Sequence, residues 1–368
     1  MTSNQTACTP ILPHSHTPIL PYVLLLLLAL LLVTRGAASP IKRIAVPPAG
    51  YWYHGVFPGD RTGREDGITP ADVDAYEKLA GARVAWVYFS HNWYAGRKFP
   101  LATARWIRKR GAVPFIRLML RSTAADNVRE TTFTVQAIAR GNFDADFRAW
   151  ARAAKQFAGP LIVEYGTECN GKWFGWNGAW TENHAAGVAA FAAAYRHIVQ
   201  LMRNEGAKNI TWVFHVNGGD DPPEAWNRFE NYYPGNDVVD WVGVSVYGAQ
   251  SPLDRQPLRR LRDRLDTVYP RLQAMAPHKP VFLLEFGCAG GNDLVQPDAW
   301  TRDALTDLLA ARWPHLAGFS WWNSHFTNDN IPAHDTTMRL QDLPKLAQTF
   351  QQLLANRQIS QRPVFTTK

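Results

Sequence analysis

The feature that most constrains the fold is a regular alternation of short apolar runs with stretches of helical periodicity. The eight runs cover residues 50–56, 84–89, 113–118, 161–164, 210–216, 241–246, 281–285 and 318–322. They are rich in β-branched and aromatic residues and have the length of buried strands. A strand followed by a helix, eight times over, predicts an α/β fold of the (β/α)8 TIM-barrel type, with one domain over residues 40–368.

The segments between the runs carry helix signals. Thr69 before Pro70 is typical of a helix start, with Thr as N-cap and Pro in the first turn. Residues 142–158, 185–202 and 343–355 have the pattern of further helices. A doubly wound open sheet is the alternative fold. It would normally show a glycine-rich phosphate loop after the first strand, and this sequence has none there.

The N-terminus has the composition of a targeting segment. Residues 19–33 form an almost uninterrupted leucine-rich stretch, and the small residues 36–39 after it suit signal-peptide cleavage. Residues 1–18 contain no Lys or Arg, whereas Arg35, Lys42 and Arg43 follow the apolar run. This charge order is the reverse of a good signal peptide. We therefore expect residues 1–39 to be a signal peptide or a membrane anchor, and the protein to be exported, periplasmic or extracellular.

Composition narrows the kinds of partner. The net charge is +8, but the basic residues are spread along the chain, which argues against a nucleic-acid surface. Most of the 15 tryptophans are expected in the core, and the rest suit sugar rings, whose apolar faces lie flat on indoles. Cys169 and Cys288 lack zinc-site spacing and are expected to be free thiols. We predict no cofactor, no catalytic metal, a monomer, and membrane contact only through an uncleaved N-terminal segment.

Two glutamates end predicted strands. Glu168 follows the fourth run and Glu285 closes the seventh. In such barrels the catalytic groups lie at the carboxyl ends of the strands, so the two side chains can face each other across the mouth. Retaining glycosidases need this pair: one carboxyl protonates the leaving oxygen and the other, about 5–5.5 Å away, attacks the sugar. The alternative for each Glu is a salt bridge with a neighbouring Arg.

The stretch 167–174, Thr-Glu-Cys-Asn-Gly-Lys-Trp-Phe, resembles the His-Glu-Met-Asn-Gly-x-Trp-Phe stretch of glycoside hydrolase family 26. That family is dominated by endo-β-1,4-mannanases and also contains β-xylanases and mixed-linkage glucanases. The resemblance implies a retaining barrel with Glu168 as acid/base and Glu285 as nucleophile. It also implies that Tyr247 donates a hydrogen bond to the nucleophile and that Trp322 forms the floor under the sugar.

Five further residues are candidates for contact with the substrate. Within the similar stretch, the resemblance implies that Asn170 and Trp173 lie at the cleft. Trp176 either lines the cleft or packs beneath the loop. His54 and His215 lie near the ends of the first and fifth runs, where they could bind sugar hydroxyls at flanking subsites or serve as structural residues.

The chain departs from the family pattern at two positions. Thr167 stands where the family has a sugar-contacting His, and Glu164 stands where the family tends to have an Arg. A buried carboxylate needs a cation, and Arg117 ends the adjacent third run. We therefore predict an ion pair between Arg117 and Glu164, with a strong loss of stability in Arg117→Met.

Three functions compete at this stage. The first is retaining endo-hydrolysis of β-mannan or a related hemicellulose. The second is the same chemistry on another β-glycan, such as an exopolysaccharide, xylan or mixed-linkage glucan, which the Thr167 departure favours. The third is a barrel that binds glycan without cutting it, and the presence of both Glu168 and Glu285 argues against it.

Overall fold

The structure is a computed structural model that describes residues 1–2, 42–60 and 62–367. The predicted signal peptide or anchor, residues 1–39, lies outside the described residues except for Met1 and Thr2. In the part of the chain that is described, every helix is too short or too polar to cross a bilayer.

Eight parallel strands form a closed barrel, which confirms the predicted fold. Neighbours in the sequence pair with one another, and the first strand also pairs in parallel with the last, from Tyr53–Gly318 to Phe57–Trp322. The strands are β2 (Trp52–Phe57), β3 (Trp86–Asn92), β4 (Val113–Met119), β5 (Leu161–Tyr165), β6 (Ile210–Asn217), β7 (Trp241–Tyr247), β8 (Val281–Gly287) and β9 (Leu316–Trp322). All eight coincide with the predicted runs, with ends shifted by up to three residues.

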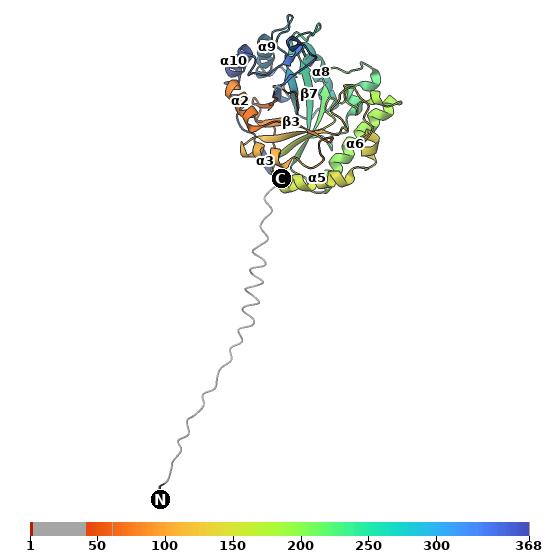
Figure 1. Ribbon diagram of the computed structural model, residues 1–368, viewed down its shortest axis with the longest axis vertical. Helices are drawn as coiled ribbons and strands as arrows, with labels where there is room; N and C mark the ends of the chain where they lie inside the picture. The colour runs from red at the N-terminus through yellow and green to blue at the C-terminus, as the bar shows by residue number, and fades with distance from the viewer. Residues whose placement is uncertain (3–41, 61, 368) are drawn as a thin grey trace. The chain divides into compact units, whose positions relative to one another are not determined.

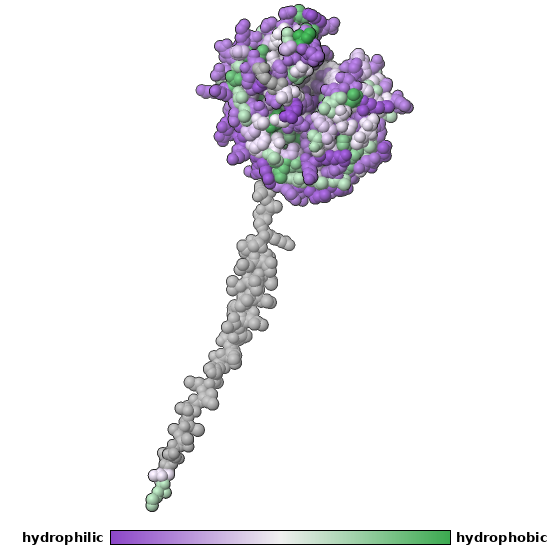
Figure 2. All heavy atoms as spheres, viewed as in Figure 1, coloured by the Kyte–Doolittle hydropathy of each residue, from purple (hydrophilic) through white to green (hydrophobic). Residues whose placement is uncertain are grey.

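Helices surround these strands (Figure 1). They are α2 (Pro70–Ala80), α3 (Leu101–Lys109), α4 (Val135–Ala139), α5 (Asp144–Phe157), α6 (His184–Asn204), α7 (Phe229–Tyr232), α8 (Leu261–Met275), α9 (Pro297–Leu309) and α10 (Pro344–Leu354). Thr69 caps α2 in a capping box with Asp72, as its sequence predicts. On the outer surface apolar residues are scattered among hydrophilic ones (Figure 2), as expected when the apolar helix faces pack on the barrel.

Large aromatic side chains fill the amino-terminal end of the barrel. Trp241 stacks on Phe282 with ring centroids 4.1 Å apart, and Trp86 meets Phe282 edge-on. Trp86 Nε1 donates a hydrogen bond to Ser320 Oγ at 2.6 Å. A Cβ atom at Gly55 would lie 2.1 Å from Trp86 Nε1, so only glycine leaves room for this indole. This packing leaves the carboxyl end of the barrel as the place for a ligand.

Several short strands lie outside the barrel and were not predicted. β1 (Lys42–Ile44) pairs antiparallel with β13 (Phe365–Thr367), and β12 (Ile359–Ser360) adds to β2. β10 (His325–Phe326) and β11 (Thr336–Thr337) form a hairpin directly after β9. Because the hairpin follows the carboxyl end of a barrel strand, it extends the wall of the mouth.

Both cysteines of the barrel domain, Cys169 and Cys288, are buried and free, as expected.

Candidate active site

Glu285 reaches the barrel mouth through an irregularity in β8. The register of β7 and β8 pairs Val244 with Leu283 and then Ser245 with Glu285, so Leu284 is an extra residue on β8. Such a bulge changes the direction of the side chains beyond it. The carboxyl of Glu285 is thereby placed among side chains from other strands, and the residue is only 3% exposed.

Three groups surround the Glu285 carboxyl. Tyr247 donates a hydrogen bond from its hydroxyl to Oε2 at 3.0 Å, as the family resemblance implies. The Tyr88 hydroxyl lies 3.0 Å from Oε1, and Arg117 Nη2 lies 3.5 Å from the same oxygen. Burial raises the pKa of Glu285 to about 7, while Arg117 lowers it and the negative charge of Glu168 raises it. The charge of Glu168 thus acts on the Glu285 carboxyl.

Glu168 lies in the loop after β5 and has an unusual backbone. Its φ of 49° falls in the left-handed region, which costs a residue other than glycine about 1–3 kcal/mol and is often found at functional sites. Trp173 donates a hydrogen bond from Nε1 to Glu168 Oε2 at 2.8 Å. A Cβ at Gly171 would lie 2.2 Å from the Trp173 ring, so this glycine permits the contact.

Both acids line one cleft of about 310 Å³. The other residues that line it are Glu65, Arg117, Asp126, Trp173, Phe174, Asn217, Tyr247, Gln250, Trp322, Phe326 and Met338. Of the predicted site residues, the structure therefore brings together Glu168, Glu285, Trp173, Tyr247 and Trp322. Trp322 stacks on Phe57 with centroids 4.0 Å apart, which holds its ring as part of the cleft wall.

His54 and Trp176 lie outside the cleft. His54 is fully buried, and its Nε2 hydrogen-bonds the Tyr76 hydroxyl of α2 at 2.7 Å. Burial lowers the pKa of His54 to about 3, so the ring is neutral and serves to pack β2 against the helices. Trp176 donates from Nε1 to the carbonyl of Thr167 and stacks on Phe174. Trp176 therefore packs beneath the loop and does not line the cleft.

Asn170 is also buried behind the cleft. Its Nδ2 donates to the carbonyls of Asn217 and Gly219 at 3.0 and 3.3 Å, and its Oδ1 accepts from the Asn217 N–H at 2.8 Å. Asn170 thus ties the Glu168 loop to the end of β6. It supports the cleft without lining it.

The predicted ion pair of Arg117 with Glu164 is present. Arg117 Nε lies 3.8 Å from Glu164 Oε1, and both side chains are buried. The arginine does more than the sequence predicted, since it also contacts Glu65 at 2.8 Å and Glu285 at 3.5 Å. One buried cation therefore serves three carboxylates on three separate elements.

His215 extends this network behind the cleft. Its Nδ1 lies 2.9 Å from Glu164 Oε2 and 3.0 Å from Thr167 Oγ1, and its Nε2 lies 2.9 Å from Ser245 Oγ. Burial alone would lower the pKa of His215, but the Glu164 carboxylate raises it above the ordinary value. Of the two roles that the sequence leaves open for His215, a flanking subsite or a structural residue, the structure has the structural one, since the side chain is fully buried and does not line the cleft.

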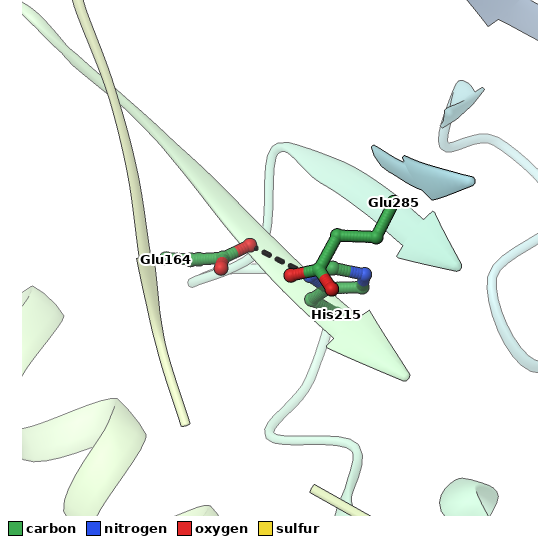
Figure 3. Close-up of side chains that lie close together, drawn as sticks. All are labelled: Glu164, His215 and Glu285. Atoms are coloured by element: carbon green, nitrogen blue, oxygen red, sulfur yellow. Dashed lines mark hydrogen bonds and ion pairs between the residues drawn. The ribbon is translucent and has the colours of Figure 1, made fainter. Parts of the chain in front are cut away.

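Glu164, His215 and Glu285 have the donor types of a metal site (Figure 3). One potential ligand atom from each lies within 4.8 Å of the others. Both carboxylates, however, also contact the Arg117 cation and the Tyr88 hydroxyl. A divalent ion among them would face the guanidinium charge at close range. The cluster fits the arginine better than a metal ion.

Several residues of the site were not foreseen. Tyr88 could have been found by alternation, because Trp86, Tyr88 and Ser90 share one face of β3. Glu65, Gln250 and Phe326 lie outside the barrel strands, where no periodicity in the sequence gives their direction.

A closed (β/α)8 barrel with two acids on one cleft at its carboxyl end is the arrangement of a glycoside hydrolase. Residues 142–258 match the model of glycosyl hydrolase family 26. Together with the fold, this match makes the chain similar to that family over the segment that holds Glu168 and Tyr247.

The chain is similar in sequence to two curated proteins whose names give different substrates. It is 27% identical over 204 residues to Endoglucanase H of Acetivibrio thermocellus, which is 54% of this chain and 22% of that protein. It is 32% identical over 117 residues to Beta-1,3-xylanase TXYA of a Vibrio species, which is 32% of this chain and 23% of that protein. The matches thus span less than a quarter of these relatives.

Solved structures show the same fold. A GH26 β-mannanase from Bacteroides ovatus has a TM-score of 0.59 and 16% identity, covering 84% of this chain and 90% of that one. An endo-β-1,4-mannanase double mutant from Cellulomonas fimi has a TM-score of 0.59 and 18% identity, covering 85% and 72%.

Proposed function

We propose that the protein is a retaining endo-β-glycosidase that hydrolyses β-mannan or a related hemicellulose by double displacement. The observation that carries this proposal is the unequal surroundings of two acids on one cleft. Glu285 is buried beside a guanidinium and accepts a hydrogen bond from the Tyr247 hydroxyl, both of which oppose the effect of burial on its pKa, while Glu168 accepts a hydrogen bond from an indole. Paired carboxyls with different environments support the division into nucleophile and acid/base.

The reaction follows from these positions. Glu168 gives a proton to the glycosidic oxygen while Glu285 attacks the anomeric carbon, which releases one part of the glycan and leaves a glycosyl ester on Glu285. Glu168, now ionised, then takes a proton from water, and the resulting hydroxide displaces the ester. Tyr247 and Arg117 hold the Glu285 carboxylate for attack. The Trp322 ring gives the sugar an apolar face to lie on.

A different β-glycan is the second candidate, and one observation favours it. Thr167 occupies the position of the family's sugar-contacting His, but it is fully buried and its hydroxyl faces His215. The chain therefore lacks that sugar contact at position 167, and its substrate preference can differ from that of mannanases. Relatives named as an endoglucanase and a β-1,3-xylanase also support a β-glycan other than mannan.

An activity screen separates these candidates. The parent and Glu285→Ala are assayed for reducing ends released from β-mannan, xylan, mixed-linkage glucan and a bacterial exopolysaccharide. We expect the parent to cleave β-mannan or a related hemicellulose, and Glu285→Ala to be inactive. Cleavage of another β-glycan alone would support the second candidate. Hydrolysis by Glu285→Ala at the parent's rate would show that the assigned nucleophile is wrong.

A further inference from the structure

Aromatic rings and arginines alternate in a row that begins in the cleft and leads out of it. The guanidinium carbon of Arg117 lies 5.3 Å from the centre of the Trp322 ring and 5.5 Å from that of Phe174. The guanidinium carbon of Arg121 lies 5.9 Å from the same Phe174 ring and 5.8 Å from that of Tyr94. We call Trp322, Arg117, Phe174, Arg121 and Tyr94 the aromatic–arginine row. Guanidinium groups stack favourably on aromatic faces, so each member fixes its neighbours.

The two ends of this row differ in exposure. Trp322 is 8% exposed and lines the cleft together with Arg117 and Glu285. Tyr94, in the turn directly after β3, is 41% exposed. The row therefore leads from the reacting acids to an aromatic ring in solvent at the rim of the mouth.

Charged groups accompany Tyr94 at this rim. Arg121 Nη1 donates to Asp126 Oδ1 at 2.7 Å, and Asp126 itself lines the cleft. Burial raises the pKa of Tyr94, the Asp66 carboxylate raises it further, and Arg121 opposes both effects, so these charges lie close to the phenol. An exposed ring bordered by paired donors and acceptors has the composition of a sugar-binding surface, with an apolar platform and polar partners for hydroxyls.

We propose that Tyr94, with the Arg121–Asp126 pair, forms a distal subsite that binds one sugar ring of a long β-glycan away from the bond being cut. The ring stacks on Tyr94, and its hydroxyls exchange hydrogen bonds with Arg121 and Asp126. This subsite rests on the proposed glycosidase function. It explains why the Tyr94 ring at the outer end of the row remains exposed whereas the Phe174 and Trp322 rings are buried.

The test is a chain-length series. It uses oligosaccharides of three to six sugars prepared from the glycan that the parent hydrolyses in the screen above. Initial rates give kcat/KM for the parent, Tyr94→Ala and Tyr94→Phe. Tyr51→Ala is the matched control, because Tyr51 is 45% exposed but precedes β2 at the opposite end of the barrel.

Loss of a stacking platform should reduce kcat/KM of Tyr94→Ala roughly five- to tenfold on the hexasaccharide, with less than about twofold change on the trisaccharide. Tyr94→Phe keeps the ring and should retain most of the hexasaccharide rate, and Tyr51→Ala should match the parent at every length. Thermal midpoints are measured alongside, and we expect all three variants to melt with the parent.

An equal loss at all lengths, or no loss at any length, would overturn the distal subsite while leaving the glycosidase intact. A length-dependent loss in Tyr51→Ala would also overturn it. Failure of the proposed function is distinguishable, since the parent would then hydrolyse none of the glycans before any variant is compared.

Discussion

The two acids of the cleft are held in opposite ways. Glu285 lies within a barrel strand, where a guanidinium and two phenol hydroxyls from β4, β3 and β7 fix its carboxyl. Glu168 lies on a loop with a left-handed backbone, and a tryptophan five residues further along the same loop donates to it. One acid is held by long-range contacts and the other by a local one.

This difference matches what the two steps of the proposed reaction demand of a nucleophile and an acid/base. A nucleophile must stay ionised and keep one position, which charge and several donors from rigid strands provide. An acid/base must lose and regain a proton in each turnover, and a strong cation beside it would oppose regaining the proton. Arg117 thus lies next to Glu285, the acid whose ionised form a cation stabilises.

The largest expected effect separates the roles of the two acids. Glu285→Gln should lose about 10⁴-fold or more in kcat/KM on both the polysaccharide and an aryl glycoside, because no nucleophile remains. Glu168→Gln should lose activity on the polysaccharide but far less in the first step on an aryl glycoside, whose leaving group needs no proton. Stopped-flow release of the phenol measures this step. Similar behaviour of both variants on the aryl glycoside would contradict the assignment.

Replacing Arg117 tests whether long-range contacts hold Glu285. Arg117→Met leaves three carboxylates without their shared partner and should destabilise the fold by about 3–5 kcal/mol, measured by urea unfolding. Arg312→Met is the control, because Arg312 pairs with Asp266 at the surface and its loss should change stability little. Unchanged stability in Arg117→Met would count against the ion-pair network.

Replacing Trp173 tests whether a local contact holds Glu168. Trp173→Phe keeps an aromatic wall in the cleft but removes the N–H that Glu168 accepts. We expect a fall in kcat of about tenfold with KM within about twofold of the parent, since the hydrogen bond orients the acid/base and not the substrate. A rise in KM with kcat unchanged would assign Trp173 to substrate binding instead.

A smaller effect is expected in the pH profile. Glu285 must be ionised to attack, so kcat/KM should fall as the pH drops through its pKa of about 7. Tyr247→Phe removes a donor to the ionised form, which raises that pKa and moves the acidic limb about half to one unit toward higher pH. A limb that stays in place or moves to lower pH would show that Tyr247 does not stabilise the charged nucleophile.

The sequence predicts the barrel strands well and the loops poorly. The strands were predictable because a buried strand is a continuous apolar run. The sequence predicts that the second strand ends at Phe89, but β3 continues to Asn92 because residues 90–92 still pair with β4. Ser90 donates to Glu65 and lies beside Arg117, which a local apolar pattern does not reveal.

Only part of the candidate site could be predicted from the sequence. The Arg117–Glu164 pair was predictable because strand-end positions on adjacent strands lie side by side, and the register does pair them. The sequence leaves His54 as a sugar-binding or a structural residue, and the structure has the second, since His54 lies in the middle of β2 and packs against Phe319 and Phe350. Glu65 and Phe326 come from connecting segments, whose direction is set by tertiary contacts.

The most direct test of the account is the anomeric configuration of the first product, followed by proton NMR during hydrolysis. If Glu285 forms a glycosyl ester and water then displaces it with help from Glu168, the new reducing end appears first in the β form and only later mutarotates. A first product in the α form would mean a single displacement by water, and Glu285 could not be the nucleophile.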